Sequence, residues 1–224
     1  MQQKITRRAL AGTALALAAA LALAGPKAGS AATPSPAASQ PPQNAKLEKV
    51  VLAGGCFWGM EAVFGALKGV HGAMPGYSGG SKDTAHYEVV STGTTGHAES
   101  VEVAYDPAVI SFRQLLEVYF LVAHDPTQLN RQGPDSGTQY RSAIFYTTDA
   151  QRRAAEAEIA KLNAAKTFAT PIVTQVVAYR AFYPAEDYHR HYVALHPDQP
   201  YVAINDLPKL QQLKERYPNL VAAQ

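Results

Sequence analysis

The chain has 224 residues, enough for one domain of ordinary size and few for two. Hydrophobic residues make up 47% of it and can fill a sizeable core, while its one cysteine excludes an internal disulfide framework, a cysteine-based zinc site and an iron–sulfur cluster held by this chain alone. The net charge of +2 arises in residues 1–32, which carry four basic residues and no acid. The remainder is nearly balanced, so charge gives no reason to expect nucleic acid or an anionic membrane as a partner.

The N-terminus has the organisation of a signal peptide, predicted over residues 1–32. A basic segment (1–8) precedes 16 apolar residues (9–24), fewer than the roughly 20 that span a membrane. Cleavage is expected after Ala24 or near residues 30–32, and the protein is expected to be periplasmic or secreted, with no stable membrane association afterwards. The pair Arg7-Arg8 is compatible with twin-arginine export. The general secretory route and an uncleaved anchor remain alternatives.

Residues 33–45 are rich in Pro, Ser, Ala and Gln and lack the apolar content to fold, so they are predicted to be a disordered linker. The folded part is therefore expected to be one catalytic domain over residues 46–224. It contains no internal repeat.

Apolar spacing and turn residues predict the elements of this domain in chain order. They are a strand at 49–53, a helix at 58–67, a weak strand from Gly69 followed by a loop at 76–80, a strand at 98–105, a helix from 111 to 123, a polar loop at 130–139, a strand at 141–147, a helix at 148–166 and a β-like run at 172–177. From 47 to 147 the order is strand, helix, strand, strand, helix, strand. We therefore expect an α+β fold, a ferredoxin-like split β-α-β sandwich with an extra helix and a long irregular C-terminal segment.

Cys56 lies between the glycines that end the first strand and the start of the first helix. A lone cysteine is usually a small buried hydrophobe. At a helix N-terminus, however, unpaired backbone N–H groups favour the thiolate, which predicts a lowered pKa and a reactive thiol. Gly54 and Gly55 are expected to allow close approach of another molecule. Phe57 and Trp58 follow directly; each alone is explained by burial in the core, and together they could wall an apolar pocket for a small substrate.

Glu99 shares one face of its predicted strand with Val101, Val103 and Tyr105, by the period of two. It is therefore expected to point to the apolar side, where burial raises the pKa of a carboxyl and suits it to act as a general acid. A carboxylate that frays into solvent at the strand end is the alternative.

Several polar residues lie outside the core spacing. Tyr77, Tyr87 and Tyr140 lie in predicted Gly/Ser/Thr-rich loops, where their hydroxyls could donate to a substrate atom or make structural hydrogen bonds. Asp135 precedes Tyr140 and could cap the loop or orient a catalytic partner. The histidines show no ligand spacing, so no metal site is predicted. A Cys–His hydrolase pairing remains an alternative, although no local signature of a cysteine protease is present.

Five motifs together resemble the A-type peptide methionine sulfoxide reductases, in that family's order and spacing. They are GCFWG (55–59), GYSGG (76–80), TGHAESVEVAYDP (95–107), HDPTQLNRQGPDSGTQYRSAIFY (124–146) and AEDYHRHY (185–192). The similarity covers about residues 48–200. It implies thiol-dependent reduction of the S-epimer of methionine sulfoxide, free or in proteins, without a cofactor.

The resemblance also implies roles for individual residues. Cys56 matches the nucleophile, which becomes a sulfenic acid, and Glu99 matches the acid that protonates the sulfoxide oxygen. Tyr87 and Tyr140 match the tyrosines that hydrogen-bond this oxygen, and Asp135 matches an aspartate that supports the site. Phe57 and Trp58 match the aromatic wall around the substrate's S-methyl group.

The chain departs from many members of the family in lacking a second, resolving cysteine. The expected partners are therefore oxidised proteins or free methionine sulfoxide as substrate, and an external thiol reductant, thioredoxin-like or glutaredoxin with glutathione. The protein is expected to be a monomer. The competing hypothesis is a redox sensor in which oxidation of Cys56 is a signal without turnover.

Overall fold

The computed structural model describes residues 46–223; the predicted signal peptide and linker lie outside this range. The helices and strands follow one another in the order β1 (Glu48–Gly54), α1 (Phe57–Gly65), β2 (Val70–Ser78), α2 (Tyr87–Val90), β3 (Ala98–Tyr105), α3 (Phe112–Val118), β4 (Arg131–Gln132), β5 (Asp135–Ser136), β6 (Ser142–Tyr146), α4 (Asp149–Ala164), β7 (Gln175–Ala178), β8 (Phe182–Pro184), α5 (Tyr192–Leu195) and α6 (Leu207–Arg216). Short 3₁₀ turns lie at Lys82–Thr84, Thr138–Tyr140 and Asp187–His189. Tyr119–Ala123 and Val202–Asp206 are π-helical and adjoin α3 and α6.

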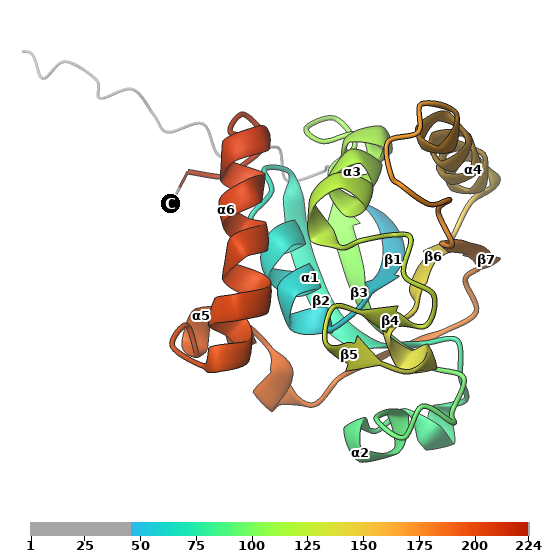
Figure 1. Ribbon diagram of the computed structural model, residues 1–224, viewed down its shortest axis with the longest axis vertical. Coiled ribbons are helices and arrows are strands. Elements are labelled where there is room, and N and C mark those ends of the chain that lie inside the picture. The colour runs from blue at the N-terminus through green and yellow to red at the C-terminus, as the bar shows by residue number, and fades with distance from the viewer. Residues whose placement is uncertain (1–45, 224) are drawn as a thin grey trace, which may run out of the picture. The chain divides into compact units, whose positions relative to one another are not determined.

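Six strands form one sheet in the order β7-β6-β1-β3-β2-β8. All neighbours are antiparallel except β6 and β7. The inner strands β6-β1-β3-β2, with α1 and α3 in the two crossovers, confirm the predicted ferredoxin-like split β-α-β arrangement. Figure 1 shows α1 and α3 on the same face of this sheet, with α6 beside α1.

The alternation in β3 explains how the sheet is covered. Val101, Val103 and Tyr105 have no exposed surface and join α1 and α3 in the main core, together with Leu52 of β1. The other face of the sheet has a smaller cluster that includes Val51 and Phe145. Within residues 46–223, none of the helices has the length and apolar character needed to cross a bilayer.

The C-terminal segment is more regular than expected, because Val202–Arg216 is continuous helix. Leu210, Leu213 and Tyr217 recur on the side of α6 that packs against the main core. Pro208, the second residue of α6, lacks an N–H, so one intrahelical hydrogen bond is missing at the junction with the π-helical turn. Helical spacing was therefore present in this part of the sequence.

Candidate active site

Cys56 is the N-cap residue of α1, immediately after the turn that ends β1. Gly55 has a φ of +91°, and a Cβ there would lie 2.5 Å from the side chain of Gln132. A Cβ on Gly54 would lie 2.8 Å from the ring of His124. The two glycines thus let the side chains of His124 and Gln132 pack closely against this turn. They were predicted to leave room for another molecule, and the protein's own side chains lie there instead. The thiol that the glycines position is 8% exposed.

The predicted lowering of the Cys56 pKa is wrong for the free protein. Burial raises the pKa of this thiol well above its usual value, and the charges of Glu99 and Asp206 raise it further. The Trp58 backbone N–H and the Lys209 ammonium lower it by less. The effect of the helix N-terminus is therefore present, but burial outweighs it and the resting thiol is protonated.

Glu99 lies on the buried face of β3, as its alternation predicts, and is 2% exposed. Its Oε2 accepts a hydrogen bond of 3.1 Å from the backbone N–H of Phe57, the first residue of α1. Burial raises the pKa of Glu99 to about 8, against the opposing effect of this bond and with a further increase from Asp135. At neutral pH the side chain is therefore a carboxylic acid with a proton to donate.

Tyr87 and Tyr140 are half-buried near this acid. Tyr87 begins α2, and Tyr140 ends a 3₁₀ turn. Burial raises the pKa of both phenols; Glu99 raises both further, and Cys56 contributes to each. The structure thus gathers the nucleophile, acid and two hydroxyl donors predicted from the sequence.

Asp135 lies in β5 and accepts a short hydrogen bond from the hydroxyl of Tyr201. It also contributes to the raised pKa of both Glu99 and Tyr140. Asp135 therefore joins the polar loop to the C-terminal segment beside the site.

Phe57 and Trp58 have different environments. Phe57 is 1% exposed and packs against Tyr77, at 5.9 Å between ring centroids, and against His189, at 4.9 Å. Trp58 is half-buried. Trp58 therefore retains accessible surface in the helix turn that carries Cys56, whereas Phe57 belongs to the packed core.

Three residues absent from our sequence prediction hold the indole of Trp58. Its Nε1–H donates to Nδ1 of His189 at 3.0 Å. Its ring stacks on Tyr192, with centroids 3.7 Å apart, and meets the edge of Tyr201 at 5.9 Å. All three come from the aromatic C-terminal segment; His189 and Tyr192 lie within the motif AEDYHRHY (185–192), and Tyr201 follows it.

Glu186 connects this segment to the site. It accepts hydrogen bonds from the Tyr77 hydroxyl at 2.8 Å and the Tyr87 backbone N–H at 3.0 Å.

Tyr77 was predicted in a loop, but it is fully buried in β2. A Cβ on Gly76 would collide with β8, so this glycine allows close strand pairing and does not mark a loop.

The histidines do not form a hydrolase site in the part of the chain described. Both ring nitrogens of His124 are engaged, by Tyr119 and Ser142, and both of His97 by Gly80 and Ser81. No histidine of residues 46–223 hydrogen-bonds Cys56. Nor does this range contain a group of three or more His, Cys, Asp or Glu side chains arranged for a metal ion.

Comparison with known families agrees with this geometry. The profile described as "Peptide methionine sulfoxide reductase" matches residues 48–220, almost the whole of the described domain. The chain belongs to this family. Its reaction is thus the thiol-dependent reduction of methionine sulfoxide, which repairs oxidised proteins.

Relatives and solved structures support membership of the peptide methionine sulfoxide reductases. A reductase named MsrA 2 of Mesorhizobium japonicum is 55% identical over 77% of this chain and 89% of its own length, and one of Synechocystis is 52% identical over 79% and 83%. The reduced form of Mxr1 from Saccharomyces cerevisiae is similar with a TM-score of 0.62 and 35% identity, over 69% of this chain and 88% of its own. Methionine sulfoxide reductase A of Corynebacterium diphtheriae gives 0.60 and 35%, over 69% and 77%.

Proposed function

We propose that Cys56 and Glu99 carry the reaction and that the substrate is the S-epimer of methionine sulfoxide, free or in proteins. The observation that carries this proposal is the hydrogen bond from Phe57 N–H to Glu99 Oε2, because it holds a buried acid beside the residue that follows Cys56. The resemblance of the five sequence motifs to the A-type reductases supports the choice of epimer.

The proposed chemistry begins with attack of the Cys56 sulfur, as thiolate, on the sulfoxide sulfur. Glu99 gives its proton to the sulfoxide oxygen, which turns a poor leaving group into hydroxide. Tyr87 and Tyr140 donate hydrogen bonds to the same oxygen, where charge changes most. Loss of the hydroxide leaves a sulfonium with a bond between Cys56 Sγ and the substrate sulfur; hydroxide then attacks Sγ, which forms the S–O bond of the sulfenic acid and releases methionine as the thioether. In sum, one thiol and one sulfoxide give one sulfenic acid and one thioether.

The raised pKa of Cys56 places a requirement on this step, because the thiol must lose its proton before it attacks. Glu99 in its protonated state removes one of the negative charges that oppose ionisation. Substrate that displaces water from Trp58 and the tyrosines would also strengthen hydrogen bonding around the sulfoxide. Ionisation of Cys56 is therefore expected to follow binding.

An external thiol is proposed to complete the cycle, because Cys56 has no cysteine partner in the chain. Two reducing thiols return the sulfenic acid to a thiol and give one disulfide and one water. A thioredoxin-like protein or glutaredoxin with glutathione would supply them. The residues named need no metal or organic cofactor for either half of the cycle.

Export and oligomeric state also stay proposals. The basic and apolar segments of residues 1–32 support a signal peptide and an extracytoplasmic enzyme, although these residues lie outside the described range. The enzyme is also proposed to be a monomer. Cell fractionation with N-terminal sequencing of the mature protein tests export, and a full-length cytoplasmic product would contradict it.

The decisive assay is reduction of an S-sulfoxide of a methionine amide with dithiothreitol as reductant. We expect turnover with the native chain, none with Cys56→Ser, and little with the R-epimer. Oxidation of Cys56 by peroxide without any sulfoxide reduction would favour the sensor hypothesis instead.

A further inference from the structure

Asp206 is a buried carboxylate beside the site that the proposed mechanism does not use. It ends the π-helical turn before α6 and has no exposed surface. Its Oδ1 pairs with Nζ of Lys209 at 3.2 Å, while Oδ2 has no hydrogen-bond partner among the described residues. A buried oxygen without a partner is costly, so stability alone does not explain this residue.

The ion pair touches the first turn of α1. A Cβ added at Gly59, three residues after Cys56, would overlap Oδ1 of Asp206 and lie 2.8 Å from Nζ of Lys209. Glycine is thus the residue that lets these two charges reach the N-terminal end of α1.

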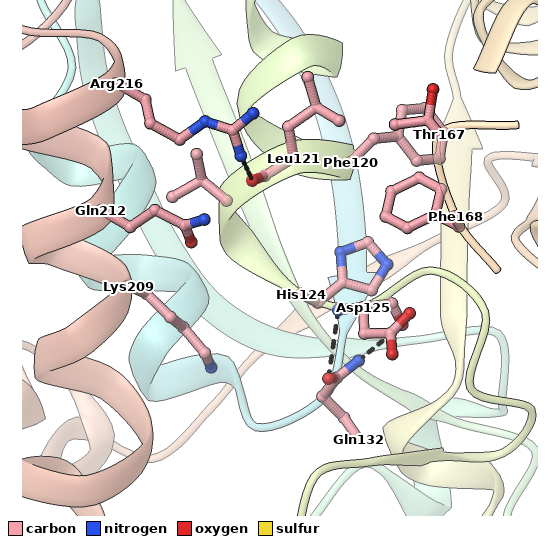
Figure 2. A pocket seen from close by; sticks show the side chains of 11 residues that line it. Phe120, Leu121, His124, Asp125, Gln132, Thr167, Phe168, Lys209, Gln212 and Arg216 are labelled. Atoms are coloured by element: carbon pink, nitrogen blue, oxygen red, sulfur yellow. Dashed lines mark hydrogen bonds between the residues drawn. The ribbon is translucent and has the colours of Figure 1, made fainter. Parts of the chain in front are cut away.

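Lys209 also lines a cavity whose other lining residues include the side chains next to Gly54 and Gly55. Figure 2 shows it reaching from α6 into this cavity of about 450 Å³, opposite His124 and Gln132. These two side chains are the ones packed against Gly54 and Gly55. The Lys209 side chain is 17% exposed, so its charge is only partly screened by water.

We propose that Asp206 and Lys209 are positioning residues whose buried ion pair sets the ionisation of the Cys56 thiol. The proposal rests on the role of Cys56 as nucleophile. The two charges act in opposite directions, since a carboxylate opposes formation of a thiolate and an ammonium favours it. Water screens both charges only partly, because the pair is enclosed against the first turn of the helix that carries Cys56.

The other groups around the thiol do not duplicate this pair. Glu99 faces Cys56 from β3, and Asp135 of β5 acts on Glu99 and Asp206. The phenols at the site, Tyr87, Tyr140 and Tyr201, remain neutral because burial raises their pKa values. His124, next to Lys209, is neutral as well, since burial lowers its pKa to about 4.

The test is the pH dependence of alkylation of Cys56 by iodoacetamide without substrate, which is unambiguous in a chain with one cysteine. Asp206→Asn should move the midpoint to lower pH and raise the rate at pH 8 by about threefold or more, a shift of about half a pH unit. Lys209→Gln should move it to higher pH, and Lys209→Arg should restore it. Lys214→Gln, which removes an exposed charge from the same helix, should leave it unchanged.

An Asp206→Asn midpoint that is unchanged or higher in a folded protein would overturn the proposal. If Asp206→Asn does not fold, an unchanged Lys209→Gln profile overturns it equally. Since alkylation needs no sulfoxide, failure here is distinct from failure of the proposed function, which the sulfoxide assay measures separately.

Discussion

Glu99 Oε2 accepts the backbone N–H of Phe57, so the acid is attached to the same helix turn that carries Cys56. This hydrogen bond joins β3 to the start of α1 across 42 residues of sequence. The N–H is one of the unpaired donors of a helix N-terminus, and Glu99 satisfies it from inside the core. The other oxygen, Oε1, accepts no hydrogen bond from residues 46–223 and can carry the proton for the substrate.

Glu99→Gln should keep the fold and slow sulfoxide reduction by roughly 100-fold or more, the usual contribution of a positioned proton donor. The amide oxygen can still accept the Phe57 N–H, but the amide cannot supply a proton. Single-turnover rates measure the chemical step directly. A rate within a few-fold of the native enzyme would contradict the role of Glu99 as the acid.

The pH dependence of kcat/KM should bend at about 8, where Glu99 titrates. Below that pH the rate rises because more thiolate forms while Glu99 stays protonated. Above it, further gain in thiolate is offset by loss of the proton on Glu99, so the profile levels off. In Glu99→Gln the rise should continue past pH 8; a bend in the same place would show that another group controls it.

The free energy of unfolding should also depend on pH through the protonation of Glu99. The folded pKa of Glu99, about 8, exceeds its unfolded value of about 4.3, so the native state binds the proton more tightly. Its contribution to the free energy of unfolding is therefore full below about pH 4.3 and declines up to about pH 8, by at most about 1.4 kcal/mol per pH unit. Urea denaturation at several pH values should show the native chain losing stability relative to Glu99→Gln over this range, and parallel curves would contradict it.

Trp58→Ala should impair substrate binding more than folding, because the indole is half-buried and belongs to the helix turn that carries Cys56. We expect a higher KM for the sulfoxide with a modest change in the denaturation midpoint. Phe57→Ala is the matched control, since its ring is fully buried and its loss should cost about 3–5 kcal/mol of stability. A large loss of stability with little change in KM for Trp58→Ala would instead show that Trp58 acts as a core residue.

Without reductant the enzyme should form one equivalent of methionine and then stop. The stalled protein should react with a sulfenic-acid trap and contain no intramolecular disulfide, because Cys56 is alone. With a thioredoxin-type donor, a mixed disulfide through Cys56 is the expected intermediate. An oxidised Cys56 that resists both the trap and added thiols would indicate a sulfenamide or over-oxidised form instead.

The spacing of apolar residues was enough to predict those elements in which it directly indicates which side chains are buried. Strand 98–105 and the inward face of Glu99 follow from alternation, and the position of Cys56 at a helix start follows from the glycines before it. The ionisation of Cys56 could not be predicted in this way, because it depends on burial and on the charges of Glu99 and Asp206, and Asp206 lies 150 residues away. The support of Trp58 by His189, Tyr192 and Tyr201 is likewise a tertiary property.

The partners of Trp58 and of Asp135 all lie beyond residue 186, so they are the last parts of the site to leave the ribosome. The strands and helices of the split β-α-β core are complete by residue 146. Some 60 further residues must therefore be added before the aromatic residues around Trp58 are present, at about 5–20 residues per second. During this time these side chains do not cover the only thiol of the nascent chain. During synthesis, the thiol that reduces methionine sulfoxide in other proteins is therefore itself open to oxidation before its site is complete.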